Sequence, residues 1–233
     1  MKTAYAVLAL FVLALFAFAG CQQQTNSVTV TGTYQVTVDP DQAEVYAGVS
    51  TLKPTAKEAQ DETNKVINAI IAGLKASGIN EKDIETQNLN LYQNMEWVDN
   101  EYKSNGWKAD QMLKVTTKDL TKVGAIVDAA VNNGANSIQG VSFSLSQDSE
   151  KAYKLQVIAK ATEDARAKAE TIAASLSAKL GKVKSFSESG FNYMPYRYDM
   201  MAVSAGKAVE EAANVQPQKV TVDATVTVEY YVG

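Results

Sequence analysis

The stretch from Ser149 to Leu180 constrains the fold more than any other part of this sequence. It contains neither Pro nor Gly, and Gly181 follows it directly. Its apolar residues recur three or four positions apart, as on one face of an α-helix, and charged residues occupy the other face. The expected apolar stripe consists of Leu155, Ile158, Ala159, Thr162, Ala165, Ala169, Ile172, Ala173, Leu176 and Leu180. Because this stripe is rich in Ala, the pattern predicts a long helix that packs closely on a sheet.

Alternation of β-branched and polar residues predicts strands before and after this helix. The expected strands cover residues 28–38, 43–49, 83–96, 107–117, 138–145, 183–187 and 220–230. Two further helices are expected over 55–77, where Thr55 and Glu58 fit a capping box, and over 119–132. This order is typical of an α+β fold, with antiparallel sheets covered by three helices, the longest about 149–180.

Turn residues indicate how the strands pair. Asp39-Pro40-Asp41 predicts a tight turn, and hence a hairpin between strands 28–38 and 43–49. A second, long hairpin is expected over 83–117, with a bulge near Asn88, where the alternation breaks. Its expected inward residues are Ile84, Leu89, Leu91, Met95 and Trp97 on the first strand, and Trp97 is expected to pair with Trp107 across the hairpin.

The first residues predict a cellular location. Lys2 is followed by an apolar run, so residues 1–20 are expected to form a signal peptide. Phe18-Ala19-Gly20-Cys21 resembles a lipobox, which predicts lipid attachment at Cys21 and a polar tether over 21–27. The alternatives are a leader cleaved without lipidation, giving a secreted protein, and an uncleaved anchor helix. All three place residues 28–233 outside the cytoplasmic membrane.

The residue composition excludes several kinds of chemistry. The chain has no His, one Cys and a formal charge of −4. Ser–His and Cys–His catalytic pairs are therefore impossible, zinc, copper and haem iron lack their usual ligands, and nucleic acid is not an expected partner. We expect no enzymatic activity, no cofactor and no metal. The alternatives are a calcium site at Asp39, Asp41 and Glu44, or a hydrolase that uses the carboxylates of Asp39 and Asp41.

Residues 190–216 show no clear period and are expected to form a loop. Its first half concentrates Tyr and Met, which are common at protein interfaces. The expected partner-contact residues are Tyr193, Met194, Tyr196, Arg197, Tyr198, Met200 and Met201. The alternatives are that the loop folds these side chains over its own domain, or that it is disordered.

Two pairs of opposite charge lie four residues apart on the long helix. Asp164 and Lys168 form one pair, and Arg166 and Glu170 form the other. Such pairs are typical of a solvated helix face. The alternative is a role in contacts between subunits.

Several motifs, in this order and spacing, resemble the SIMPL-domain family, a domain of unknown function. They include Val30-Thr31-Gly32 leading to Asp39-Pro40-Asp41, then Gly134-Ala135-Asn136-Ser137-Ile138, and the more specific run from Asp164 to Glu170. The resemblance covers about residues 28 to 232 and describes them as one SIMPL-like domain, 28–233. It implies an envelope, periplasmic or secreted protein. Family members include some linked to oxidative stress and one that assembles into a ring-like oligomer, but no catalytic residues are established.

These observations together predict a membrane-tethered extracytoplasmic lipoprotein. We expect it to form a homo-oligomer through its sheet edges and long helix, and to contact the membrane through the lipid on Cys21. An unknown protein partner is also expected. The alternative function is an envelope binding module for a small molecule or peptide that uses the Tyr- and Met-rich loop.

Overall fold

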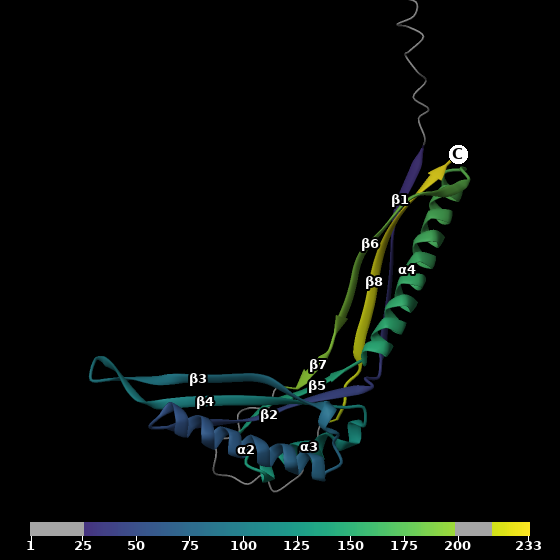
Figure 1. Cartoon of the computed structure of the whole chain (residues 1–233). Coiled ribbons are helices and arrows are strands. Elements are labelled where there is room, and N and C mark those ends of the chain that lie inside the picture. The colour runs from purple at the N-terminus through teal and green to yellow at the C-terminus, as the bar shows by residue number, and fades with distance from the viewer. Residues whose placement is uncertain (1–25, 199–215) are drawn as a thin grey trace, which may run out of the picture.

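The computed structural model describes residues 26–198 and 216–233, which form two lobes that meet at an angle (Figure 1). Each lobe consists of one antiparallel sheet with helices on one of its faces. The apolar core of each lobe is a separate cluster, and Tyr196 packs against both. The expected α+β fold with three helices is therefore confirmed for the described residues.

The smaller lobe is a three-stranded sheet with one long helix on it. In spatial order its strands are β1 (Ser27–Val38), β8 (Val220–Val232) and β6 (Leu180–Met194). Helix α4 (Gln147–Ser175) lies along this sheet, mostly over β1 and β8 (Figure 1). The residues buried between them are Val157, Ala161, Ala165, Ala169 and Ala173 of α4 and Val220, Val222, Ala224, Val226, Val228 and Tyr230 of β8. This confirms the expected alternation of the last strand.

The larger lobe is a five-stranded sheet covered by two shorter helices. Its strands, in spatial order, are β3 (Ile84–Val98), β4 (Glu101–Thr117), β2 (Gln42–Lys53), β5 (Ser137–Ser144) and β7 (Tyr196–Tyr198), with α2 (Ala56–Ala76) and α3 (Val123–Asn132) on one face. Short 3₁₀ turns, η1 (Glu81–Asp83) and η2 (Leu120–Lys122), precede β3 and α3. The capping box of α2 is confirmed, since Thr55 Oγ1 accepts a hydrogen bond from the Glu58 N–H and Glu58 accepts one from the Thr55 N–H.

The prediction of a hairpin between the first two strands is wrong. Strand β1 pairs with β8, whereas β2 lies between β4 and β5 in the other sheet. The Asp39-Pro40-Asp41 segment is therefore the corner at which the chain passes from one lobe to the other. Local turn chemistry fits a corner as well as a hairpin, so it does not determine the partner of either strand.

The long helix ends earlier than predicted, and part of its expected stripe faces solvent. Its last turn is capped at Leu176, and Ser177 adopts a left-handed φ of 54°, which ends the helix before Gly181. Leu155 and Leu176 are exposed, whereas the small residues at every fourth position are buried. A helix that approaches a sheet this closely has room only for small side chains in the contact, so the larger apolar residues lie outside it.

The long hairpin of β3 and β4 is confirmed, together with the bulge between Thr86 and Asn88. The prediction that Leu89, Leu91, Met95 and Trp97 face inward is wrong, because all four are exposed. Trp97 is opposite Tyr102, not Trp107, and the two rings meet edge to face with centroids 4.7 Å apart. Met95 and Trp97 lie beyond the last pairing of β2 with β4, where the hairpin extends past the rest of its sheet (Figure 1).

The expected loop 190–216 is wrong in its first part. Strand β6 continues to Met194, far beyond the predicted strand 183–187, and β7 then joins the larger sheet beside β5. Three register irregularities in the pairing of β6 with β8 shift the alternation and hide the strand period in the sequence. The second part of the loop lies outside the described residues.

Candidate functional site

The carboxylates considered for calcium or for hydrolysis have separate partners. Within residues 26–198 and 216–233, no group of His, Cys, Asp or Glu is arranged to hold a metal ion. Glu44 accepts a hydrogen bond of 2.7 Å from the Tyr46 hydroxyl. Asp39 is 80% exposed and lies 3.7 Å from the ammonium of Lys219. Asp41 faces the start of α4.

Asp41 fastens the corner between the lobes to the first turn of α4. Its carboxylate accepts hydrogen bonds from the N–H and hydroxyl of Ser146, at 2.5 and 2.8 Å, and from the hydroxyl of Ser149 at 2.5 Å. Burial alone would raise the pKa of Asp41, but these hydrogen bonds outweigh it and hold the pKa below its ordinary value. Asp41 is therefore a structural anion at a helix N-terminus.

Two of the expected partner-contact residues, Tyr193 and Tyr196, are partly buried and pack against the cores of their own domain. The Tyr193 hydroxyl accepts a hydrogen bond of 2.5 Å from the Leu145 N–H, and burial raises the pKa of Tyr193. Tyr196 packs against the cores of both lobes. The segment that holds them thus joins the two sheets, which is the alternative in which these side chains cover their own domain.

The other expected contact residues are distributed differently. The Arg197 guanidinium lies 5.6 Å from the ring centroid of Tyr46, whose pKa is raised to about 12, first by burial and then by Glu44. Met194 and Tyr198 remain exposed, at 68% and 48%. Met200, Met201 and the proposed lipid site Cys21 lie outside the described residues. The structure therefore brings no single Tyr and Met patch together among the residues it describes.

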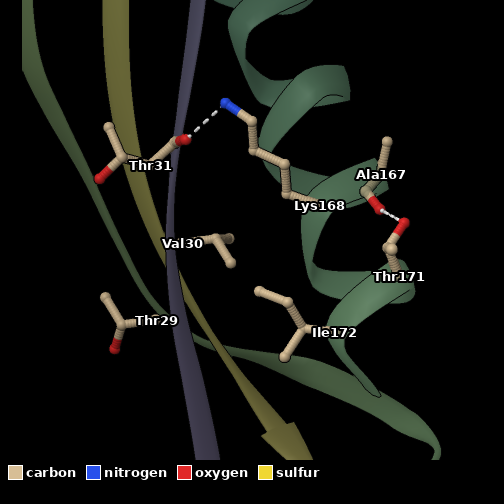
Figure 2. A pocket seen from close by; sticks show the side chains of 7 residues that line it. All are labelled: Thr29, Val30, Thr31, Ala167, Lys168, Thr171 and Ile172. Carbon is tan, nitrogen blue, oxygen red and sulfur yellow. Dashed lines mark hydrogen bonds between the residues drawn. The ribbon is translucent and has the colours of Figure 1, made fainter. Parts of the chain in front are cut away.

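The Asp164–Lys168 pair holds the outer edge of β1, a role that sequence reasoning missed. Asp164 accepts a hydrogen bond of 2.9 Å from the Thr33 N–H. The Lys168 ammonium donates one of 3.1 Å to the Thr31 carbonyl, as Figure 2 shows. The two side chains also pair with each other at 2.7 Å. Hydrogen bonds from Lys168 and from the Thr33 N–H hold the pKa of Asp164 below its ordinary value.

A groove of about 500 Å³ opens between β1 and α4 next to this pair. Figure 2 shows its lining of Thr29, Val30, Thr31, Ala167, Lys168, Thr171 and Ile172. Lys168 is already paired, and the Thr171 hydroxyl donates to the Ala167 carbonyl at 2.9 Å. The groove therefore offers mainly apolar contact from Val30 and Ile172, and few free polar groups that could orient a ligand.

Replacing the edge-holding pair by D164A/K168A is expected to lower the free energy of unfolding by about 1–2 kcal/mol, because two backbone hydrogen bonds and one ion pair are lost. It should also increase association, because an open sheet edge pairs readily with another strand. Urea unfolding and light scattering measure the two effects. The matched control is R166A/E170A, which removes an ion pair of 2.8 Å on the exposed face of the same helix and should leave the unfolding midpoint nearly unchanged. Equal effects of the two double variants would contradict the edge role.

The end of the β3–β4 hairpin forms an exposed arm, which we define as residues 94–106. The pairing of β2 with β4 ends at Lys53 and Trp107, so only two strands continue into the arm. On one face lie Met95, Trp97 and Tyr102, which are 49%, 57% and 69% exposed. The opposite face carries Glu96 and Lys103, which are directly paired in the register. The arm is therefore amphipathic.

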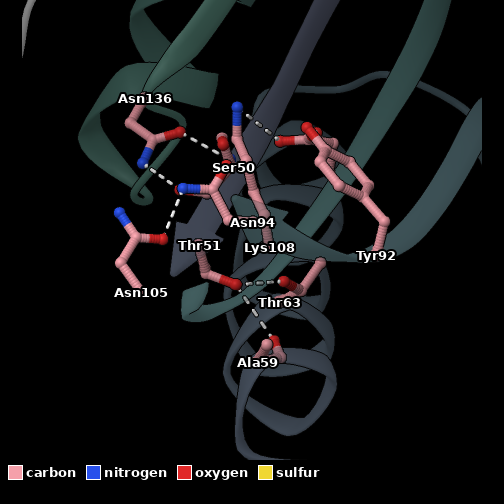
Figure 3. A network of polar contacts seen from close by, with 10 residues as sticks. Ser50, Thr51, Ala59, Thr63, Tyr92, Asn94, Asn105, Lys108 and Asn136 are labelled. Carbon is pink, nitrogen blue, oxygen red and sulfur yellow. Dashed lines mark hydrogen bonds and ion pairs between the residues drawn. The ribbon is translucent and has the colours of Figure 1, made fainter. Parts of the chain in front are cut away.

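Polar side chains fix the base of the arm (Figure 3). Asn94 donates to Asn105 at 2.6 Å, and Asn105 in turn donates to Glu96 at 3.1 Å. Asn136, which lies just before β5, accepts a hydrogen bond from the N–H of Ser50 on the neighbouring strand β2 and donates one to the Ser50 carbonyl, at 2.8 Å each. These bonds hold the end of the sheet from which the arm projects, so its aromatic face has a defined orientation.

The fold and these surfaces define a two-lobed α+β protein with two sheet-and-helix layers. The family described as SIMPL, a protein of unknown function (DUF541), matches residues 28–230, so the chain belongs to this family. It is 28% identical to the 26 kDa periplasmic immunogenic protein of Brucella melitensis over 221 residues, which cover 89% of this chain and 88% of that protein.

A second relative is the uncharacterized protein YggE of Escherichia coli. It is 28% identical over 212 residues, which cover 86% of this chain and 85% of YggE. The protein of the same name from Edwardsiella ictaluri is 25% identical over 187 residues. In the two described stretches of the chain, none of the helices is both long enough and apolar enough to cross a membrane.

Proposed function

We propose that this chain is an extracytoplasmic envelope protein that is tethered to the membrane by a lipid on Cys21 and acts by self-association and binding. The apolar leader and the lipobox-like residues before Cys21 support the tether. The name of the Brucella relative supports a periplasmic location. Catalysis is not part of the proposal, and the link to oxidative stress remains an expectation drawn from the family.

The observation that carries self-association is the amphipathic arm. A two-stranded hairpin is only marginally stable in water without a third strand or other packing. The arm nevertheless presents Met95, Trp97 and Tyr102 to solvent, and Trp and Tyr are the types that dominate the energetics of protein interfaces. A second copy of the arm would cover these side chains with an identical apolar face.

The free edges of the two sheets also indicate the arm and strand β3 as the site of self-association. The edge of β1 is held by Asp164 and Lys168, whereas β3 has no strand on its outer side among the described residues. Strand β3 runs from Ile84 to Val98 and so continues directly into the arm. Another copy can therefore pair with the β3 edge and pack against the aromatic face at once.

The test is the mass of residues 28–233 in solution, measured by light scattering. We expect a mass several times that of one chain, and a shift to smaller species in W97S/Y102S. The matched control is L155S/L176S, which removes two exposed apolar side chains from α4 and should leave the mass unchanged. Circular dichroism checks that both variants remain folded. A monomeric wild type overturns the proposal. If only the control variant dissociated, the interface would lie on α4 and not on the arm.

The binding-module alternative keeps one supporting observation, the exposure of Met194 and Tyr198 at the junction of the two sheets. A ligand that contacts them would bind a folded M194S/Y198S variant less tightly without a change in its mass. Loss of the oligomer in that variant would instead favour self-association through this junction.

A further inference from the structure

A hollow of about 500 Å³ lies in the larger lobe, apart from the arm and from the groove beside α4. It is formed where four segments converge: the start of β2, the connection from α2 to β3, the end of β4, and η2. Its lining consists of Gln42, Gly78, Ile79, Asn80, Lys82, Asp83, Thr116, Thr117, Lys118 and Lys122. A volume of this size is within the range of small-molecule sites, about 300–1,000 Å³.

The lining carries three lysines and one acidic residue. Lys82, Lys118 and Lys122 form no ion pair with any described residue, whereas most other described cations do. The one acid of the lining, Asp83, is bonded by the side-chain amide of Asn80 at 3.3 Å. The hollow therefore has an excess of positive charge in a chain whose net charge is −4.

The acidic neighbour of the hollow is also engaged. Asp119 lies close enough to Lys122 for the two charges to interact. Its carboxylate, however, accepts hydrogen bonds from both the N–H and the hydroxyl of Thr121, at 3.1 and 2.6 Å. Asp119 is thus fixed as the cap of η2, so the N–H donors of the Lys122 ammonium can bind a ligand in the hollow.

Gly78 leaves space at the wall of the hollow. Gly78 follows the end of α2 with a φ of +85°, and no other atom of residues 26–198 and 216–233 lies within 4 Å of the position a Cβ would take there. The last carbonyls of α2 are bonded by the following N–H groups, as in Ile79 N–H to Leu74 O at 3.1 Å. These carbonyls are therefore partly neutralised, so they oppose an anion in the hollow less strongly.

We propose that this hollow binds a small molecule through a phosphate group, with Lys82, Lys118 and Lys122 as the charged donors. Lysine ammonium groups bind phosphate as point charges. Three of them complement a ligand group with two negative charges, such as phosphate, better than they complement a carboxylate with one. The volume also leaves room for a substituent beyond the phosphate. This binding does not depend on self-association through the arm.

Isothermal titration calorimetry with inorganic phosphate and with pyrophosphate, at constant ionic strength, tests the proposal on residues 28–233. We expect saturable binding by the wild type, and a loss of at least about tenfold in affinity in K82Q/K118Q/K122Q. The matched control is K65Q/K151Q/K182Q, which removes the same charge from exposed lysines that also form no ion pair among the described residues. It should bind like the wild type. The variants are first shown to keep the wild-type unfolding midpoint.

Two outcomes overturn the proposal. One is the absence of saturable binding of either anion by the wild type. The other is an equal loss of affinity in both triple variants, which would mean that overall charge, and not this hollow, attracts the anion. If the lysine variant fails to fold, chemical-shift changes on phosphate titration of the wild type decide the matter, since they must centre on residues 78–83 and 116–122.

Discussion

The G32A variant is expected to lose about 2–3 kcal/mol of unfolding free energy, because no space exists for a methyl group between β1 and α4. A Cβ at this position would lie 2.0 Å from the carbonyl oxygen of Ala161 and 2.6 Å from the backbone nitrogen of Ala165. Both are backbone atoms of a helix and cannot rotate away. The helix must therefore move off the sheet, which opens the contact along Ala161, Ala165 and Ala169. Urea denaturation followed by circular dichroism measures the loss.

The G190A variant is the matched control. Gly190 also lies in a strand of the smaller sheet, but its φ is not positive and no atom in the described part of the chain lies within 4 Å of its Cβ position. Its substitution should change stability by no more than about 0.5 kcal/mol. If G32A proved as mild as G190A, the close approach of α4 to β1 would be wrong.

The D41A variant is expected to lose about 2–3 kcal/mol, because three donors of the α4 N-terminus lose a charged acceptor at once. These are the N–H and hydroxyl of Ser146 and the hydroxyl of Ser149. The matched control is D39A, since Asp39 is 80% exposed and its one ion pair with a described residue is the long contact with Lys219. It should be nearly neutral. Equal losses in D41A and D39A would contradict the fastening role of Asp41.

The effect of Asp41 should depend on pH in a defined direction. Because the pKa of Asp41 is lower in the folded than in the unfolded state, its contribution is fully present above the unfolded value of about 3.9. It is lost as the pH falls through the lower, folded pKa. The difference in unfolding free energy between wild type and D41N should therefore be constant near neutral pH and shrink below about pH 4. A difference that grew on acidification would contradict this assignment.

The sequence predicts local structure well where period and capping coincide. The strand from Val220 to Tyr230 alternates without interruption, and the capping box at Thr55 and Glu58 marks the start of α2 to the residue. In both cases every signal lies within a few neighbouring residues. Strand β6 could not be predicted in this way, because its register shifts against β8 interrupt the alternation of apolar and polar residues along the strand.

Contacts between distant segments could not be predicted in the same way. The pairing of β1 with β8 joins the two ends of the domain, and nothing near Asp39 specifies it. The Asp164–Lys168 pair fits a solvated helix face until β1 is placed beside it. For the same reason, the sequence does not show that Lys82 lies beside Lys118 and Lys122 around the proposed phosphate-binding hollow, since the segments that carry them meet only in the fold.

The pairing of Ser27 with Tyr231 puts both described ends of the chain side by side, at the end of the smaller lobe that points away from the larger one (Figure 1). In the tethered protein, the smaller lobe would therefore act as a spacer between the membrane and the larger lobe. Helix α4, 29 residues long, sets the height of that spacer at roughly 44 Å. The arm would then meet other molecules well above the lipid surface, and a label fused to Gly233 would lie near the membrane without obstructing it.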